Sequence, residues 1–294
     1  MTPRHGADTE LPAEGDGLAV VAADGHRFRL LLRTPAAPVA ALLWLPALGV
    51  AARHYLRFAE ALAARGIAMF VHEWRGHGSS SLRAGRDMDW GYRELLGTDL
   101  PGSVDCIRGH YPDLPMILGG HSLGAQLAVA LLALQPKAAE RLWLVASGSP
   151  FWRVFPRPRG WLLPLTYRFL PWLADRNGSL PGRSIGFGGR EARGVIHDWA
   201  RTGLSGRYTG KGMSVDLEAA LGSVHAEVDA VLLGDDWLAP RASLDFLLAK
   251  MRPADVRIDT IDAARLGTRA DHFGWMKRPE AVAAALAKDL QTST

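Results

Sequence analysis

Strand-like apolar runs alternate with helix-like segments along most of this chain, and that alternation limits its fold more than any other feature. The run at 39–45 is continuously apolar, as is typical of a strand buried on both faces. The segment at 53–65 then carries apolar residues at helical spacing and ends at Gly66. Because strands that alternate with helices form a parallel sheet covered on both faces, we predict an α/β fold.

The same two patterns recur along the rest of the chain. Runs at 18–22 and 28–33, joined by Asp24-Gly25, predict an N-terminal hairpin. The remaining strands are predicted at 39–45, 67–71, 114–118, 142–146, 228–233 and 256–261. Helices are predicted at 53–65, 90–110, 123–134, 241–251 and 279–290, with Pro101 inside the second of them.

The alternation stops at Gly148 and resumes only at 228, an interval too long for a plain loop in a compact domain. We expect this insertion, which follows the fourth buried strand, to form a mostly helical cap over one edge of the sheet. The tail is assigned from its Pro, Gly and charged residues. The predicted organisation is a flexible tail at 1–16, the first part of the core at 17–149, a cap or lid at 150–226, and the second part of the core at 227–294.

Composition narrows the class of protein. The 294 residues are 48% hydrophobic and 22% charged, which excludes a mainly disordered chain. The single cysteine, Cys106, has no partner for an intrachain disulfide, which fits a reducing compartment. The longest apolar run, 39–52, is shorter than a membrane span and contains a proline. Residues 1–17 lack the apolar core of a signal peptide, so we expect a cytoplasmic protein.

The net charge of +4 hides an uneven distribution. Residues 151–211 contain ten Arg and one Lys against three acidic residues, a net charge of +8, whereas the rest of the chain carries −4. This basic segment lies in the predicted cap. Three hypotheses fit it: aromatic packing with solvated Arg heads, an amphipathic lid that meets acyl chains or a membrane surface, or recognition of an anionic substrate or thioester cofactor. No nucleic-acid-binding motif accompanies it, so we expect no nucleic-acid partner.

The strongest local motif is Gly120-His121-Ser122-Leu123-Gly124, between the predicted strand at 114–118 and the predicted helix at 123–134. This is the G-x-S-x-G pattern in the strand–turn–helix context that it requires. Such a sharp turn lifts Ser122 above the sheet edge, and glycines at 120 and 124 avoid collisions with neighbouring strands. The N-terminus of the following helix points its free N–H groups at the reacting centre.

A serine hydroxyl is a weak nucleophile unless a histidine takes its proton and an acid orients that histidine. In this arrangement the chain order is Ser, then Asp or Glu, then His. Asp235 and Asp236 follow the strand at 228–233, and one of them could cap the next helix while the other orients the histidine. His272 is the only histidine after Asp236, which makes it the sole base candidate in this order.

The negative charge that develops on a carbonyl oxygen during such attack needs two backbone N–H donors. One candidate is Leu123, directly after the nucleophile, and the other is Leu48, in the loop that follows the strand at 39–45. The histidines are not at metal-ligand spacing, and this chemistry needs no metal or cofactor. We therefore predict neither.

These motifs together resemble the α/β-hydrolase superfamily. More narrowly, the chain is similar to bacterial "predicted alpha/beta hydrolase" proteins related to serine aminopeptidases and monoglyceride lipases. The resemblance covers about 39–147 and 228–290, and the family pattern of Asp, three residues, Pro falls on Asp236 and Pro240, which favours Asp236 over Asp235. The matching stretches are Leu45-Pro-Ala-Leu-Gly-Val50, Trp74-Arg-Gly-His-Gly-Ser79, Gly119-Gly-His-Ser-Leu-Gly124, Asp235-Asp-Trp-Leu-Ala-Pro240 and His272-Phe-Gly-Trp275.

Three positions depart from the family pattern. Many relatives have His-Gly where this chain has Pro46-Ala47, a second Gly where it has Ala125, and a Gly before the histidine where it has Asp271. None of these changes removes a chemical group that the mechanism needs. In the matching loop at 74–78, we interpret Arg75 and His77 as structural residues.

The resemblance implies a serine hydrolase that cleaves a carboxylic ester or related acyl bond of a small molecule through a Ser122–Asp236–His272 triad. An acyltransferase with the same triad is an alternative, because the elbow does not distinguish water from another acceptor. A non-catalytic ligand-binding protein with this fold is a second alternative. The elbow carries Ser rather than Asp, which disfavours haloalkane dehalogenation.

Overall fold

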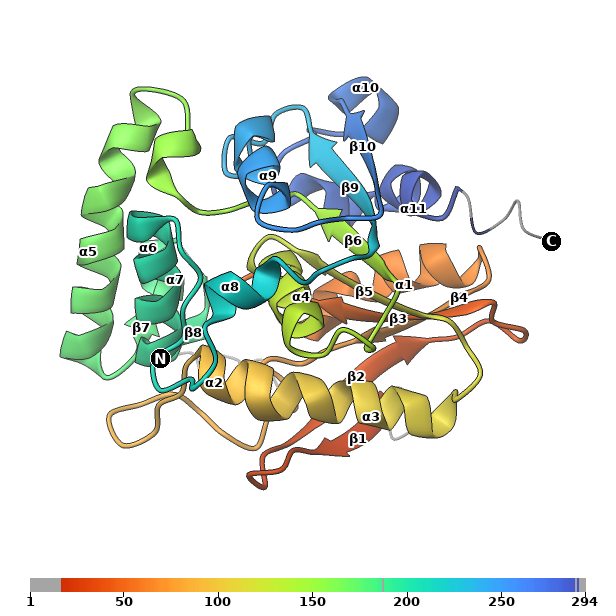
Figure 1. The fold of residues 1–294 in the computed structure, drawn as a ribbon, viewed down its shortest axis with the longest axis horizontal. Coiled ribbons are helices and arrows are strands. Elements are labelled where there is room, and N and C mark those ends of the chain that lie inside the picture. Colours follow the sequence, from red (N-terminus) through yellow and green to blue (C-terminus); the bar gives the residue numbers. More distant parts are fainter. Residues whose placement is uncertain (1–16, 187, 289, 291–294) are drawn as a thin grey trace, which may run out of the picture.

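A computed structural model describes residues 17–186, 188–288 and 290 of the chain, so the predicted tail at 1–16 lies outside the described residues. A twisted eight-stranded sheet forms its centre (Figure 1), with the strand order β1-β2-β4-β3-β5-β6-β9-β10. The strands are β1 (Gly17–Val21), β2 (Arg27–Arg33), β3 (Ala40–Leu45), β4 (Ile67–Val71), β5 (Met116–His121), β6 (Arg141–Val145), β9 (Glu227–Leu233) and β10 (Asp255–Ile261).

Strand direction separates the N-terminal edge of the sheet from the rest. β1 pairs antiparallel with β2, and β2 pairs antiparallel with β4. Every other pairing in this eight-stranded sheet is parallel, along the order β4-β3-β5-β6-β9-β10. The carboxyl ends of these parallel strands therefore lie at one edge, where ligands bind in open α/β sheets. The predicted α/β-hydrolase fold, a mostly parallel sheet flanked by helices, is confirmed.

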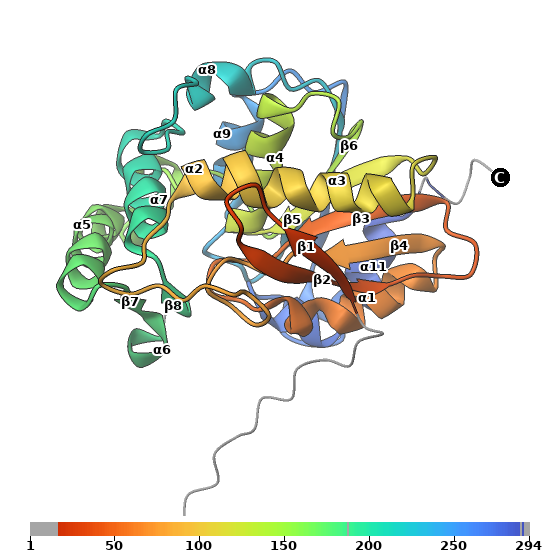
Figure 2. The same ribbon diagram turned by 90° about the horizontal axis from the view of Figure 1, so that it is seen from below.

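Helices cover both faces of the sheet, and each face has its own apolar core (Figure 2). α3 (Leu100–His110), α4 (Leu123–Leu134) and α9 (Arg241–Leu248) pack on one face. α1 (Leu56–Ala63) and α11 (Glu280–Leu286) pack on the other face. The central strands are buried from both sides, which explains why β3 and β4 are apolar at every position.

The predicted helix at 90–110 is interrupted. The structure has α2 (Tyr92–Glu94), a π-helical turn η3 (Leu95–Asp99) and then α3, with Pro101 in the first turn of α3. Proline has no N–H to donate, and its ring collides with the carbonyl four residues earlier in a regular α-helix. The wider turn that precedes Pro101 relieves this collision.

Other boundaries differ from the predictions for local reasons. β5 begins at Met116 rather than at 114, since Pro115 has no N–H for the ladder, although its carbonyl accepts from the Ala41 N–H. The helix predicted at 53–65 begins as a 3-10 turn, η2 (Ala52–Tyr55), before α1. α9 and α11 end before the predicted limits of 251 and 290.

The segment between β6 and β9 contains mostly helices. These elements are η4 (Trp152–Val154), α5 (Arg159–Asn177), β7 (Leu180–Pro181), α6 (Gly182–Ile185), β8 (Arg190–Glu191), α7 (Arg193–Ser205) and α8 (Leu217–Leu221). α5 and α7 stand side by side next to the sheet (Figure 1), around a small apolar core of their own, while α8 packs on α4. Within the described ranges, no helix has the length and apolar character needed to cross a bilayer.

Candidate active site

The turn between β5 and α4 holds Ser122 in a strained conformation. Ser122 has φ +55° and ψ −120°, a backbone region that residues other than Gly rarely adopt. Its N–H donates to the Val145 carbonyl on the neighbouring strand at 3.1 Å, which ties the turn to the sheet. A Cβ at Gly120 would lie 2.4 Å from the Gly124 carbonyl carbon, and one at Gly124 would lie 2.0 Å from the Leu45 oxygen. The turn therefore requires glycine at both positions.

Asp236 and His272 are brought together from the ends of β9 and β10. The His272 Nδ1 lies 2.7 Å from Asp236 Oδ2, and both residues are 7% exposed. The other oxygen, Oδ1, accepts the N–H groups of Leu238 and Ala239 at 2.9 and 3.3 Å. The carboxylate is thus held by the backbone on one side and by the imidazole on the other, which fixes the tautomer of His272.

Asp235 has a different role from its neighbour. Its Oδ2 accepts the Ala270 N–H at 3.2 Å, and its own N–H donates to the Ala270 carbonyl at 2.9 Å. It therefore fastens the loop that carries His272. The hypothesis that one of the two aspartates caps the next helix is wrong, because the N-cap of α9 is Pro240 and has no side-chain cap.

Ser122 and His272 line one cavity of about 350 Å³ at the carboxyl edge of the sheet. Such a volume suits a small molecule. The eight-stranded sheet and the helices packed on its two faces, which we call the body of the protein, supply the floor of the cavity. The segment between β6 and β9 supplies a largely apolar wall that includes Phe155, Leu163 and Tyr167.

The two predicted oxyanion donors, Leu48 and Leu123, line the same cavity. Among the described residues, neither backbone N–H has a hydrogen-bond partner. For Leu123 this follows from its place as the first residue of α4, where intrahelical acceptors are lacking. The neighbouring Ala47 N–H is occupied, since it donates to the Tyr55 hydroxyl at 2.9 Å. Leu48, rather than Ala47, is thus the open donor of that loop.

Tyr55 links the loop to the nucleophile turn, a contact that the sequence analysis missed. Its hydroxyl lies 2.9 Å from His121 Nδ1 and is fully buried. Burial lowers the pKa of His121 well below its usual value, so the imidazole is neutral and its Nδ1 accepts a hydrogen bond from the Tyr55 hydroxyl. One buried hydroxyl therefore aligns residue 47 with residue 121.

The loop after β3 also contacts the segment between β6 and β9 through main-chain atoms. A Cβ at Gly49 would lie 2.1 Å from the Gly189 nitrogen and 2.3 Å from the Gly188 Cα. Next to this contact, His77 Nε2 lies 3.2 Å from Glu191 Oε1, and that oxygen accepts the Gly189 N–H at 2.8 Å. His77 thus anchors the segment rather than facing the cavity.

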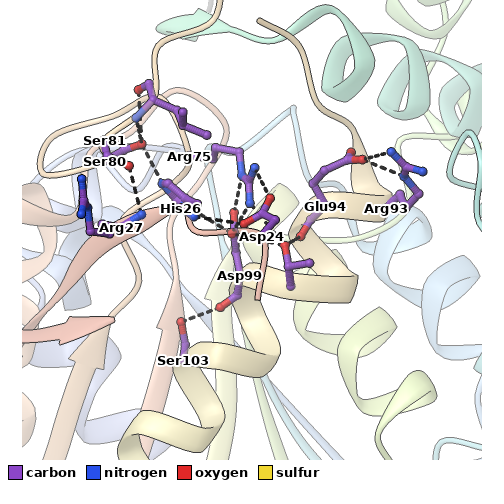
Figure 3. A network of polar contacts seen from close by, with 12 residues as sticks. Asp24, His26, Arg27, Arg75, Ser80, Ser81, Arg93, Glu94, Asp99 and Ser103 are labelled. Carbon is purple, nitrogen blue, oxygen red and sulfur yellow. Dashed lines mark hydrogen bonds and ion pairs between the residues drawn. The ribbon is translucent and has the colours of Figure 1, made fainter. Parts of the chain in front are cut away.

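Arg75 belongs to a buried polar network away from the cavity (Figure 3). It binds Asp99 through two nitrogens, at 2.6 and 2.8 Å, and Asp24 at 2.8 Å. His26 lies between Asp99 and Ser80, at 2.9 and 2.8 Å. Burial alone would raise the pKa of Asp99, but the hydrogen bonds from Arg75 and His26 bring it below its usual value. The network fastens the loop after β4 to the hairpin and to η3.

No group of three or more His, Cys, Asp or Glu side chains within the described ranges could hold a metal ion.

Comparison with known proteins assigns the family. The chain belongs to the serine aminopeptidase S33 family, whose model matches residues 36–186, just over half of the chain. It is also 32% identical to monoglyceride lipase of Mus musculus over 82 residues, which are 28% of this chain and 26% of the lipase. The chain therefore matches about a quarter of that relative's length. The family resemblance noted in the sequence is confirmed.

Solved structures share the fold at low sequence identity. A thermophilic esterase from Thermogutta terrifontis superimposes with a TM-score of 0.61 at 16% identity, over 94% of this chain and 98% of the esterase. The monoacylglycerol lipase of Paleococcus ferrophilus superimposes with a TM-score of 0.59 at 15% identity, over 90% of this chain and 99% of the lipase. These matches show the fold alone, and with the family match they place the chain among the α/β-hydrolases.

Proposed function

We propose that the protein is a serine hydrolase that cleaves a carboxylic ester or related acyl bond. The observation that carries this proposal is the 2.7 Å contact between His272 and Asp236, in a cavity that Ser122 also lines. His272 Nε2 accepts the Ser122 proton while Ser122 Oγ attacks the carbonyl carbon. Asp236 holds His272 in the tautomer that can accept that proton and stabilises the resulting cation.

The open N–H groups support the rest of the cycle. The N–H groups of Leu48 and Leu123 bind the oxyanion that forms when Ser122 attacks. His272 then returns its proton to the leaving alcohol, and the carbon–oxygen bond breaks to give an acyl-enzyme. Water, deprotonated by His272, attacks the acyl-enzyme and releases the acid and free Ser122.

Labelling with a fluorophosphonate probe tests the nucleophile directly. Ser122 takes the label stoichiometrically, whereas Ser122→Ala takes none. Hydrolysis of p-nitrophenyl esters of increasing chain length, compared with transfer to added alcohols, separates a hydrolase from an acyltransferase. Equal labelling of the wild type and Ser122→Ala would contradict the mechanism, and unlabelled wild-type protein would favour a ligand-binding role.

The outward face of α5 supports contact with a lipid surface. Five large apolar side chains on it are between 50% and 66% exposed, and residues 151–177, which include α5, contain five Arg and one acidic residue, Asp175. Aromatic and cationic side chains on one helix face are typical of peripheral membrane binding. We propose an anionic bilayer as the partner of this face. Its apolar members are Trp161, Leu162, Leu165, Phe169 and Trp172.

Vesicle sedimentation tests this partner. The wild type binds vesicles that contain phosphatidylglycerol at low salt and is released by high salt, because exposed charges are screened. A Phe169→Ser, Trp172→Ser double variant binds at least about tenfold more weakly, since two exposed aromatic anchors are lost. The wild type's failure to bind these vesicles at low salt would refute the proposal.

A further inference from the structure

The cavity beside Ser122 contains buried polar groups that hydrolysis itself does not use. Gln126 is the only polar residue of α4, a helix in which eleven of twelve residues are buried. It follows Ser122 by four residues, and its backbone N–H donates to the Ser122 carbonyl at 3.3 Å. Gln126 is 5% exposed and lines the cavity. A buried amide costs stability unless its hydrogen bonds are satisfied.

A second buried residue fixes the orientation of this amide. The Tyr208 hydroxyl donates to Gln126 Oε1 at 3.1 Å. Burial raises the pKa of Tyr208, so its hydroxyl keeps the proton that it donates. Among the described residues, the Gln126 amide nitrogen has no hydrogen-bond partner. The amide is therefore held by its oxygen, and two N–H donors are left for another group.

Ser149 belongs to the same cavity wall, but its hydroxyl is closed off from the cavity. It is completely buried, and both of its backbone groups are bonded to Ser243, at 2.9 and 2.8 Å. Its Oγ lies beside the Tyr208 hydroxyl, behind the Gln126 amide. A group that enters the cavity therefore meets Gln126 and not Ser149.

Other polar side chains of the cavity wall are already bonded. The Ser147 hydroxyl donates to the Ser122 carbonyl, and the Thr166 hydroxyl donates to the Leu162 carbonyl. The described residues that line the cavity include no Lys, Arg, Asp or Glu. A charged ligand group would therefore be buried without a counter-ion, which is unfavourable, whereas a neutral oxygen can accept a hydrogen bond from the Gln126 amide.

We infer that the Gln126 amide forms a subsite for a neutral oxygen-bearing group, a hydroxyl or a carbonyl, carried by the substrate near its scissile bond. Gln126 and Ser122 line the same cavity and are joined by a main-chain hydrogen bond of 3.3 Å, which places this group close to the attacked carbon. The inference rests on the proposed function and adds a substrate class to it: small oxygenated esters rather than plain alkyl esters.

Two pairs of substrates distinguish the acyl part from the alcohol part. The acyl pair is p-nitrophenyl butyrate and p-nitrophenyl 3-hydroxybutyrate, and the alcohol pair is ethyl butyrate and 2-hydroxyethyl butyrate. In at least one of the two pairs, the wild type has a kcat/KM for the oxygenated ester about tenfold above that for the plain ester. This is the size expected for one or two buried hydrogen bonds. That ratio falls about fivefold to tenfold in Gln126→Met.

Comparison of ratios between variants removes the intrinsic reactivity of each ester. Thr166→Val is the matched control, because its hydroxyl lines the same cavity but is already bonded, and it keeps the wild-type ratio. A wild-type ratio near one in both pairs would overturn the inference. An equal loss on plain and oxygenated esters in Gln126→Met would also overturn it.

Labelling separates failure of this subsite from failure of the proposed function. If fluorophosphonate labels Ser122 while both ratios stay near one, only the subsite is refuted. If Ser122 takes no label, binding becomes the test: 3-hydroxybutyramide raises the melting temperature of the wild type more than butyramide does, and Gln126→Met removes the difference. Equal shifts with the two amides would then refute the subsite as well.

Discussion

Helices α4 and α5 each contain five Leu residues, yet one is buried and the other is largely exposed. In α4 eleven of twelve residues are buried, and in α5 only five of nineteen are buried. α4 is covered by the sheet on one side and by α8 on the other, whereas α5 packs on α7 along one side only. Similar apolar content therefore marks the core in the body of the protein and an outward face in the segment between β6 and β9.

The same contrast applies to two acid–histidine pairs, and it predicts the largest effect. Asp236–His272 in the body is 2.7 Å apart and buried, while Asp175–His197, which joins α5 to α7, is 2.9 Å apart and exposed. Asp236→Asn favours the His272 tautomer that carries its proton on Nε2 and cannot accept the Ser122 proton there. It lowers kcat/KM by about 10⁴ on a p-nitrophenyl ester. Asp175→Asn changes kcat/KM less than about twofold. Similar losses in the two variants would break the comparison.

Two arginines test whether the contrast extends to charge. Arg75→Met leaves Asp99 buried without its bidentate partner, which lowers the free energy of unfolding by about 3–5 kcal/mol. Arg168→Met removes an exposed guanidinium from α5 and changes that free energy by less than about 0.5 kcal/mol. Urea unfolding of both variants measures the difference. A mild effect at Arg75 would mean that the network in Figure 3 contributes little to stability.

Matched leucines compare the helices themselves. Leu127→Ala in α4 creates a cavity in the core and lowers the free energy of unfolding by about 3 kcal/mol. Leu165→Ala in α5 removes a side chain that is 66% exposed and changes it by less than about 0.5 kcal/mol. Thermal or urea unfolding distinguishes these outcomes. A large loss at Leu165 would show that another surface covers α5 in solution.

The smallest effect concerns pH. Burial lowers the pKa of His72 in the body to about 3, so between that value and about 6.5 the unfolded chain binds a proton that the folded chain does not. Stability is therefore lost as pH falls below about 6.5, at about 1.4 kcal/mol per pH unit.

His72→Phe lowers this slope by about 1.4 kcal/mol per pH unit between pH 6.5 and 5, the amount that corresponds to one proton. Urea unfolding at several pH values measures the slope. The buried and uncharged Val71→Ala is the control, because it lowers stability without altering the slope. An unchanged slope in His72→Phe would mean that His72 is protonated in the folded protein.

Periodicity predicts the body well because its strands are buried on both faces. β4 occupies the predicted residues, and β3 begins one residue late. The π-helical turn was missed although its cause, Pro101, is visible in the sequence, since proline in a helix also permits a kink or an end. Within the segment between β6 and β9, elements as short as β7 and β8 have no detectable period.

In the candidate site, too, some contacts could be predicted from the sequence and others could not. The order Ser, Asp, His in the sequence leaves Asp235 and Asp236 as possible partners of His272, and the family pattern favours Asp236, which lies 2.7 Å from His272. The catalytic roles of the three residues stay predictions. Tyr55 was missed because its partner, His121, lies 66 residues away and no local pattern encodes such a contact. Gln126 had a usable signal, since it is a lone polar residue in an apolar helix.

The contact between Gly49 and residues 188–189 constrains how this protein can vary. Two main chains meet there with no room for a Cβ at Gly49, while a Cβ at Gly189 would lie 2.6 Å from His77 Cε1. In a set of related sequences, Gly49 would be the position least able to gain a side chain unless the facing segment moved with it. The outward face of α5 has no such partner within the described chain, and it can diverge while the loop that carries Leu48 keeps its shape.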